Sequence, residues 1–284
     1  MNVGGGIPLE RVYLYSEPRC QSLHVEEIAR YLRDNLGERV EVIEREDFWA
    51  TTLRHMQRGE IEAVGLKWAQ SRVLDPASHV VSRQPLPQEV IYEVKRLTDT
   101  GSRAWGILYD AWEVVKIALD LLPIAERSLR NLHVLFTNQL IATWEALEGR
   151  YHAMVAAFAL PCVISTTGIA VAPARDRGWY ALKYLLGRGL EEVGLAFDEI
   201  NRLEVDDEKL TEVCKGLVLQ CVFYHLTGNP FCDDHSCRLY NAHWQREMVY
   251  AQLRPGACLC KRHRQMLQQA VARWSTGRTV VETG

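Results

Sequence analysis

The chain has 284 residues, a formal net charge of −3, 48% hydrophobic residues and 24% charged residues. This composition is ordinary for a globular protein, and the length suits one large domain or two modest ones. A net charge so close to zero excludes a global field that would favour nucleic acid or an anionic membrane.

The apolar runs are short and interrupted by charges, so we expect no transmembrane helix. The first residues lack a basic region followed by an apolar one, so we expect no signal peptide and a cytoplasmic protein. Thiols stay reduced in that compartment, which makes clustered cysteines better metal ligands than disulfides. The isolated Cys20, Cys162 and Cys214 are expected to be small buried hydrophobic residues.

Strand and helix patterns alternate along the first two thirds of the chain. Residues 11–16 and 39–43 have strand patterns and enclose a helical pattern at 24–36, which together predict a βαβ unit. Further strands are predicted at residues 89–97, 132–137, 151–159 and 162–165, and a short strand or turn at 105–109. Helices are predicted at 46–73, 111–122, 179–186 and 190–203. A loop is predicted from Thr167 to about Pro173.

The last third is predicted to be helical. Asp206 and Asp207 are suitable N-terminal caps, and Gly228 is a suitable end, for one long helix. Two further helices are predicted at residues 242–253 and 261–274. We therefore predict an α+β fold, with a mixed sheet packed on helices. It divides into an α/β part, residues 1–205, and a helical part, residues 206–284.

Two pairs of metal-ligand residues stand in the helical part. Cys232 and Cys237 form one pair, and Cys260 and His263 form the other. Zinc prefers four such ligands in a tetrahedron, with two supplied by each of two chain segments. The pattern predicts a structural Zn²⁺ site that stabilises a small subdomain with little core of its own. Cys258 and His235 are alternative ligands, since each lies close to one pair.

The spacing of these residues resembles that of the archaemetzincins, a branch of the metzincin zinc peptidases. That family carries His-Glu-x-x-His-x-x-Gly-x-x-His-Cys, followed by further cysteines. With His225 as the second histidine, Gly228 takes the glycine position and Cys232 takes the position of the first cysteine. The pattern YHLTG…CRL…NAHWQ…LC…H also resembles an uncharacterised archaeal and bacterial group described only as candidate metallopeptidases. The resemblance implies a metzincin-like mixed sheet, a bound zinc ion and a relation to hydrolases.

The chain departs from the peptidase motif at the positions that carry the chemistry. Cys221 stands at the first histidine, Val222 at the glutamate and Phe231 at the third histidine. In a zinc peptidase the glutamate accepts a proton from the metal-bound water, which valine cannot do. The motif therefore resembles a degenerate catalytic helix.

A different set of residues could restore a catalytic site. Cys221 and His225 are four residues apart, as are His243 and Glu247 on the next predicted helix, so His225, His243 and Glu247 could form a site, with Cys221 as a further ligand. The alternatives are a core histidine at 225, hydrogen-bonded to a backbone carbonyl, and a solvated helical pair at 243 and 247.

Two functions remain open from the sequence. One is a divergent metallopeptidase that uses the histidines named above, and the other is a catalytically inactive relative that binds a peptide or protein partner. A nucleic-acid partner is not favoured, because the basic residues Lys261, Arg262, Arg264 and Arg273 are equally explained by helix-end electrostatics. No membrane partner is expected.

Overall fold

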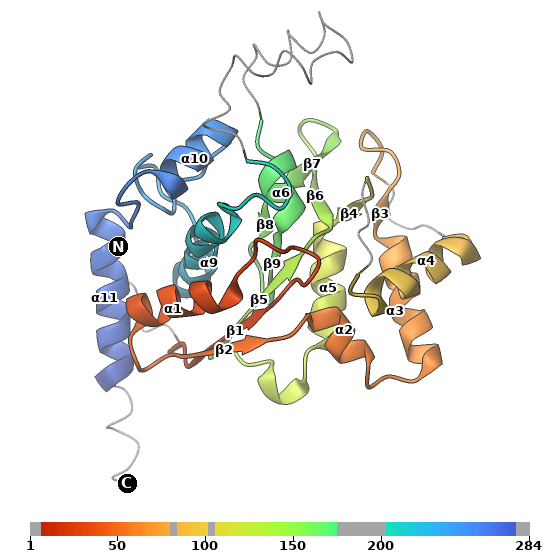
Figure 1. Cartoon of the computed structure of the whole chain (residues 1–284), viewed down its shortest axis with the longest axis horizontal. Coiled ribbons are helices and arrows are strands. Elements are labelled where there is room, and N and C mark those ends of the chain that lie inside the picture. Colours follow the sequence, from red (N-terminus) through yellow and green to blue (C-terminus); the bar gives the residue numbers. More distant parts are fainter. Residues whose placement is uncertain (1–6, 80–83, 102–105, 175–202, 277–284) are drawn as a thin grey trace, which may run out of the picture.

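A five-stranded sheet lies at the centre of this computed structural model, which describes residues 7–79, 84–101, 106–174 and 203–276 (Figure 1). The strand order is β2-β1-β5-β9-β8. The first four strands are parallel and β8 is antiparallel to β9. The strands are β1 (Arg11–Tyr15), β2 (Glu41–Arg45), β5 (Asn131–Thr137), β8 (Ala156–Ala157) and β9 (Cys162–Ser165). The predicted βαβ unit is confirmed, since β1 and β2 pair in parallel around α1 (Val25–Leu36).

A second sheet has the strand order β3-β4-β6-β7. β4 and β6 are parallel and the other two pairs are antiparallel, so the predicted mixed architecture is confirmed. The strands are β3 (Arg72–Val73), β4 (Leu108–Asp110), β6 (Leu140–Glu145) and β7 (Arg150–Met154). β7 ends the order and is an edge strand.

Helices cover both faces of the central sheet (Figure 1). The helices beside α1 are α9 (Leu210–Thr227), α10 (Gln245–Leu253) and α11 (Lys261–Thr276). On the other face lie α2 (Phe48–Leu53), α3 (Arg58–Gln70), α4 (Pro87–Thr98) and α5 (Ala111–Leu121). The short elements α6 (Thr166–Val171) and η1 (Ile124–Glu126) complete the described helices.

Two cores follow from the alternation of side chains along β1. Val12 and Leu14 join the core that contains α1 and α9, whereas Tyr13 and Tyr15 join the core that contains α2, α3 and α5. Successive residues of a strand point to opposite faces, so one strand supplies both cores. The first core also holds Leu267 of α11, so the helical part packs directly on the parallel sheet. The predicted boundary at residues 205 and 206 stays a prediction.

Helix α9 is buried on all sides along its centre, since every residue from Gly216 to Phe223 is buried. A helix that is apolar all round belongs inside a protein, where it contacts several elements. α9 contacts α1, α10 and β5. It begins at Leu210 with Lys209 at its N-cap position, so the prediction that Asp206 or Asp207 caps it was wrong. It ends at Thr227, where the positive φ of Gly228, 72°, provides the left-handed C-terminal stop.

Two further sequence predictions of secondary structure were wrong. Residues 89–97 form most of α4, which begins with a proline at its first turn and a capping glutamate, Glu89. The predicted loop after Ser165 contains α6, because the Ser165 hydroxyl accepts a hydrogen bond from the Gly168 amide and caps the helix. β6 was missed. The helices predicted at 179–186 and 190–203 fall almost entirely outside the described residues.

None of the described helices combines the length and the apolar character needed to cross a membrane.

Candidate functional site

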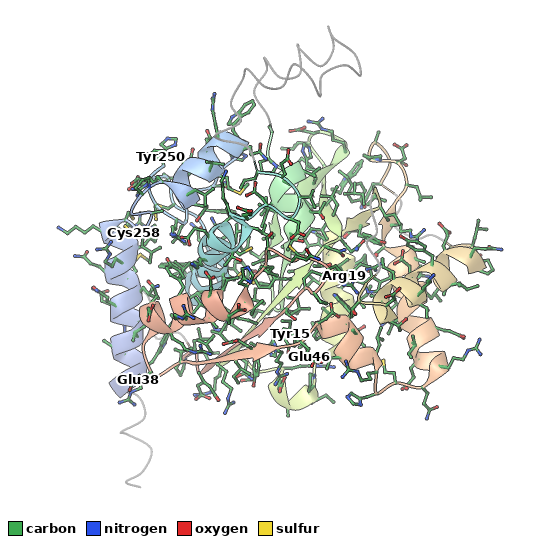
Figure 2. All side chains as sticks on the ribbon, viewed as in Figure 1. Tyr15, Arg19, Glu38, Glu46, Tyr250 and Cys258 are labelled. Carbon is green, nitrogen blue, oxygen red and sulfur yellow. The ribbon has the colours of Figure 1, made fainter. Side chains whose placement is uncertain are left out.

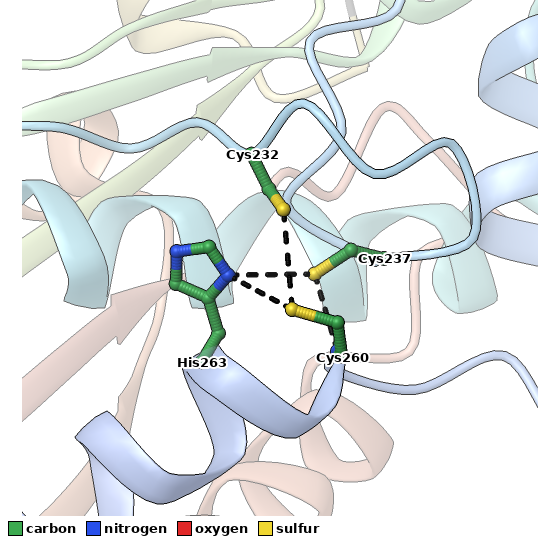
Figure 3. Close-up of side chains that lie close together, drawn as sticks. All are labelled: Cys232, Cys237, Cys260 and His263. Carbon is green, nitrogen blue, oxygen red and sulfur yellow. Dashed lines mark hydrogen bonds between the residues drawn. The ribbon is translucent and has the colours of Figure 1, made fainter.

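Four side chains from two chain segments converge near the start of α11 (Figure 3). The sulfur atoms of Cys232 and Cys260 are 4.0 Å apart. The Nδ1 atom of His263 lies 3.2 Å from the sulfur of Cys260 and 3.9 Å from that of Cys237. All four atoms lie within 4.8 Å of one another, so the cluster could hold a metal ion. In the described parts of the chain, no other group of three or more His, Cys, Asp or Glu side chains meets this condition.

Backbone hydrogen bonds bring the two segments together. Short bridges connect Cys232 with Tyr240 and Cys237 with Cys258. The amide of Arg238 donates to the carbonyl of Cys258 at 3.2 Å. Cys260 immediately precedes α11 and His263 lies in its first turn, so residues three apart face the same way. The ligand geometry therefore follows from the local backbone.

The sulfur atoms receive backbone hydrogen bonds and are held in a partly dry environment. The amide of Cys260 donates to the sulfur of Cys237 at 3.3 Å, and the amide of Asp234 donates to the sulfur of Cys232 at 3.4 Å. Burial raises the pKa of Cys237 to about 12 and also raises the pKa of Cys232. Burial lowers the pKa of His263. A metal cation would reverse the effect on the thiols, because it stabilises thiolates outright.

The cluster is attached to the body of the protein through α9. The ring of His263 packs edge-on against Phe223 of α9, with centroids 5.2 Å apart. Arg238, which directly follows Cys237 in the sequence, forms an ion pair with Glu212 of α9 and lies over the ring of Tyr31 on α1. A metal bound here would therefore link α11 and the loop after α9 to the central core.

The two alternative ligands lie outside the cluster. Cys258 lies between the end of α10 and the start of α11 (Figure 2), where its sulfur accepts a hydrogen bond from Arg264 at 3.2 Å. The ring of His235 packs against Tyr240 with centroids 4.4 Å apart. Neither residue is in the four-membered group, so the structure brings together the set Cys232, Cys237, Cys260 and His263.

Cys221 and His225 do not form part of a metal cluster. The Cys221 side chain is fully buried beside Cys162 of β9, and burial raises its pKa well above the ordinary value. The half-buried His225 lines a cavity of about 500 Å³ near the end of α9. Burial lowers the pKa of His225, an effect that the nearby Leu129 backbone opposes. This position agrees with the alternative of a packed histidine near a backbone carbonyl.

His243 and Glu247 lie at the start of α10 and are linked by a hydrogen bond. One carboxylate oxygen of Glu247 accepts hydrogen bonds from the amides of His243 and Trp244, at 3.0 and 3.1 Å. Glu247 therefore caps its own helix. The exposed His243 lines a different cavity from His225. The structure does not bring His225, His243 and Glu247 together, so it gives this trio no metal-binding geometry.

A cleft of about 730 Å³ separates β7 from α9. The residues of α9 that line it are Leu217, Gln220 and Tyr224. Gln220 and Tyr224 each stand one residue before Cys221 and His225, so they lie on a different side of the helix. A step of one residue rotates a side chain by about 100° around a helix, which explains why the aligned motif positions miss the cleft. Five aromatic residues contribute to the rest of the lining: Trp112, Phe158, Phe231, Tyr240 and Trp244.

Sequence reasoning named His243 of this cleft but missed its two buried glutamines. Gln220 and Gln252 are 4% and 2% exposed and both line it. His152 of β7 lies at its wall and contacts Glu148 at 3.1 Å. The helical spacing of Leu217, Gln220 and Tyr224 could have identified this face of α9 from the sequence. The histidine motif instead indicated the residues that follow two of them, Cys221 and His225.

A family model described as "Probable metallopeptidase family (DUF6775)" matches residues 8–270. Among solved structures, the chain is similar to the archaemetzincin of Methanopyrus kandleri, with 11% sequence identity and a TM-score of 0.45. That match covers 93% of this chain and 97% of the other. No curated protein matches the sequence. The family match spans nearly the whole chain and confirms the relation to candidate metallopeptidases that was predicted from the sequence.

Proposed function

The chain belongs to this probable metallopeptidase family, and from that premise we propose that it is a zinc-stabilised peptide-binding member that does not use the zinc-water chemistry of a peptidase. The observation that carries the proposal is the separation of the two sites. None of the four clustered ligands lines the cleft, and the α9 face that lines the cleft offers leucine, glutamine and tyrosine. The metal stabilises the fold, and the cleft binds the partner.

Zinc is the ion that suits the cluster best. Zinc bonds of about 2.3 Å to sulfur and about 2.0–2.1 Å to nitrogen imply tetrahedral edges of about 3.8 Å between sulfurs and about 3.5 Å between sulfur and nitrogen. The spacings of 4.0, 3.9 and 3.2 Å lie close to these edges. Three thiolates and one imidazole fill all four corners, which is typical of a structural rather than a catalytic zinc ion. None of the eight cysteines forms a disulfide, and three thiolates on a zinc ion suit the reducing, cytoplasmic environment that we propose.

The chemistry of α9 argues against a peptidase mechanism. A catalytic zinc ion needs protein ligands around an open position, together with a base for the attacking water. Val222 stands at the position of the base and is fully buried. Cys221 at the first ligand position is equally buried and faces Cys162. Neither residue lines the cleft in which a substrate would lie.

The cleft has the character of a peptide site. Its volume of about 730 Å³ lies in the range of ligand-binding pockets. Aromatic rings supply apolar contact, while Gln220, Asn241 and Gln252 supply amide groups that match peptide groups.

The metal part of the proposal is tested by elemental analysis of purified protein. We expect one zinc per chain, little or none in Cys237→Ser, and an unchanged content in the matched control Cys258→Ser, since Cys258 lies outside the cluster. The Cys237→Ser protein should also be less stable by more than about 3 kcal/mol. Equal zinc in both variants would contradict the ligand set. A second metal that is lost in His225→Ala would favour a divergent metallopeptidase.

The peptide part is tested by incubation with a peptide library, with binding measured by fluorescence anisotropy and cleavage by mass spectrometry. We expect saturable binding without cleavage. Tyr224→Ala should weaken binding about tenfold, since it removes about 1.4 kcal/mol of contact. Tyr250→Ala is the control, because Tyr250 is exposed and outside the cleft lining. Cleavage that chelators abolish would overturn the proposal in favour of an active hydrolase.

A further inference from the structure

Two thiols of the metal cluster are accessible to a small oxidant. Cys232 and Cys260 are partly exposed, whereas Cys237 is 0% exposed. Cys232 lies in the loop that follows α9, and Cys260 directly precedes α11, so both stand outside the described helices. Loops move more readily than the elements that they connect, so the positions of these two thiols can change.

The same two thiols face one another from different segments of the chain (Figure 3). Their sulfur atoms are 4.0 Å apart. Because the sulfurs of a disulfide are about 2 Å apart, the two atoms would have to approach by about 2 Å. The third sulfur, of the buried Cys237, accepts a hydrogen bond from the amide of Cys260 at 3.3 Å. Cys232 and Cys260 are therefore the pair best placed for oxidation.

A fifth thiol, Cys258, stands near the cluster without belonging to it. It is partly exposed, and its sulfur accepts a hydrogen bond from Arg264 at 3.2 Å. Its sulfur is outside the group of ligand atoms that all lie within 4.8 Å of one another. Cys258 is therefore an internal control, since it is similarly exposed but is not one of the clustered ligands.

We propose that hydrogen peroxide converts Cys232 and Cys260 to a disulfide, which expels the zinc ion, so that the cluster is a reversible redox switch. This inference rests on the zinc site proposed above. The thiolate of Cys232 attacks the peroxide, an S–O bond forms, the O–O bond breaks and hydroxide leaves. The thiolate of Cys260 then attacks that sulfur, an S–S bond forms, the S–O bond breaks and a second hydroxide leaves. The two thiolates lose two electrons in total, and the peroxide accepts both.

Disulfide formation removes half of the zinc ligands. The thiolate is the form of cysteine that binds metal, and a disulfide has none, so only Cys237 and His263 would remain. A structural zinc ion needs four ligands in a tetrahedron. The ion is therefore released, and a thiol reductant together with zinc restores the original site.

The switch acts next to the cleft, because the loop that carries Cys232 forms part of its lining. Phe231 directly precedes Cys232, Tyr240 is bridged to it, and both rings line the cleft. The amide of Cys232 donates to the carbonyl of Leu239 at 2.8 Å, which ties the two parts of the loop together. Movement of Cys232 towards Cys260 would therefore shift the backbone that carries both rings.

The test is peroxide treatment of the full, zinc-loaded chain. A chromogenic chelator measures the released zinc, alkylation counts the remaining thiols, and mass spectrometry locates the disulfide. We expect one zinc released and two thiols lost per chain, a Cys232–Cys260 disulfide, and faster hydrogen exchange in residues 229–241. A reductant with added zinc should reverse all of these changes.

The outcomes separate this proposal from the one on which it rests. Protein that contains no zinc when purified would overturn the structural zinc site and the switch together. Protein that contains zinc and keeps it, while peroxide oxidises Cys258 alone or joins Cys258 to another cysteine, would overturn the switch and leave the zinc site standing.

Variants identify the reacting pair. Cys232→His removes the pair but keeps four ligands of the two-cysteine, two-histidine kind that structural zinc accepts, so peroxide should release its zinc at least tenfold more slowly. Cys260→His is the equivalent change on the other segment. Cys258→Ser should release zinc at the rate of wild type, since it leaves the four clustered side chains unchanged. Equal rates in wild type and both histidine variants, or slow release in Cys258→Ser, would contradict the proposed pair.

Discussion

At the scale of single residues, His133 shows how burial makes stability depend on pH. It is 4% exposed in the middle of β5, stacks on Tyr13 with centroids 4.5 Å apart, and its Nδ1 atom lies 3.0 Å from the hydroxyl of Tyr15. Burial lowers the pKa of His133 below the value of about 6.5 found in an unfolded chain. The folded protein therefore holds this ring in its neutral form.

We predict that His133→Gln makes the stability of the protein less sensitive to acid. Below pH 6.5 the unfolded chain binds a proton that the folded protein does not, so the free energy of unfolding falls as pH falls, by up to about 1.4 kcal/mol per pH unit for one group. The free energy of unfolding, measured with urea at several pH values between 7 and 5, should fall less steeply with falling pH in the variant than in wild type. The exposed His24, changed to Gln, is the control. Equal slopes in wild type and His133→Gln would contradict the prediction.

At the scale of elements, the contact between α6 and β7 depends on a glycine. A Cβ atom at Gly168 would lie 2.3 Å from the carbonyl oxygen of Met154 and 2.9 Å from Cβ of Ser165. The first of these atoms belongs to the backbone of β7, so the strand or the helix would have to move. The two elements can lie this close only because residue 168 has no side chain.

We predict that Gly168→Ala destabilises the protein by about 1–3 kcal/mol, as overpacking does. Gly59→Ala in α3 is the matched control, because a Cβ atom there meets nothing within 4 Å. That substitution should be neutral or stabilise by about 0.4–1 kcal/mol. Urea midpoints measure both effects, and a Gly168→Ala protein as stable as wild type would show that β7 moves freely.

The elements also show where the sequence was informative. The βαβ unit, the long helix α9 and its glycine stop were predictable, because apolar spacing and the glycine end signals agreed there, whereas the predicted N-terminal caps of α9 did not. α4 was not, since its β-branched residues imitate a strand, while its buried side includes Glu93 and Arg96, paired at 2.7 Å. Hydrophobic periodicity cannot recognise a helix whose buried face is partly charged.

The candidate site, like the fold, was predictable from the sequence only in part. The four clustered side chains could be chosen from sequence spacing, because two close pairs in adjacent segments have few ways to meet. The orientation of α9 could not, because a helix buried on every side has no polar face to fix its rotation. His225 and His243 consequently lie in different cavities.

At the scale of the whole molecule, the metal cluster and the parallel sheet hold different parts of the chain. α9 belongs to the core shared with α1, β1 and β5, whereas α11 contributes Leu267 to that core and would be held to the loop after α9 by a metal ion in the cluster. We predict that a chelator exposes residues 229–276 to hydrogen exchange while β1 and β5 stay protected.

Hydrogen exchange followed by mass spectrometry measures this difference. The Cys237→Ser protein should already exchange rapidly in residues 229–276, and the chelator should change it no further. If β1 and β5 lost protection together with α11 when metal was removed, the metal would be holding the entire fold, and the division into two regions would be incorrect.

The order of the ligands along the chain also has a consequence for biosynthesis. Cys232 and Cys237 leave the ribosome before Cys260 and His263, and at about 5–20 residues per second the second pair follows within a few seconds. By then the strands of the central sheet and α9 have all been synthesised. In the proposed zinc protein, metal capture therefore follows the synthesis of the central sheet and α9, and zinc starvation is expected to leave residues 229–276 open to proteases.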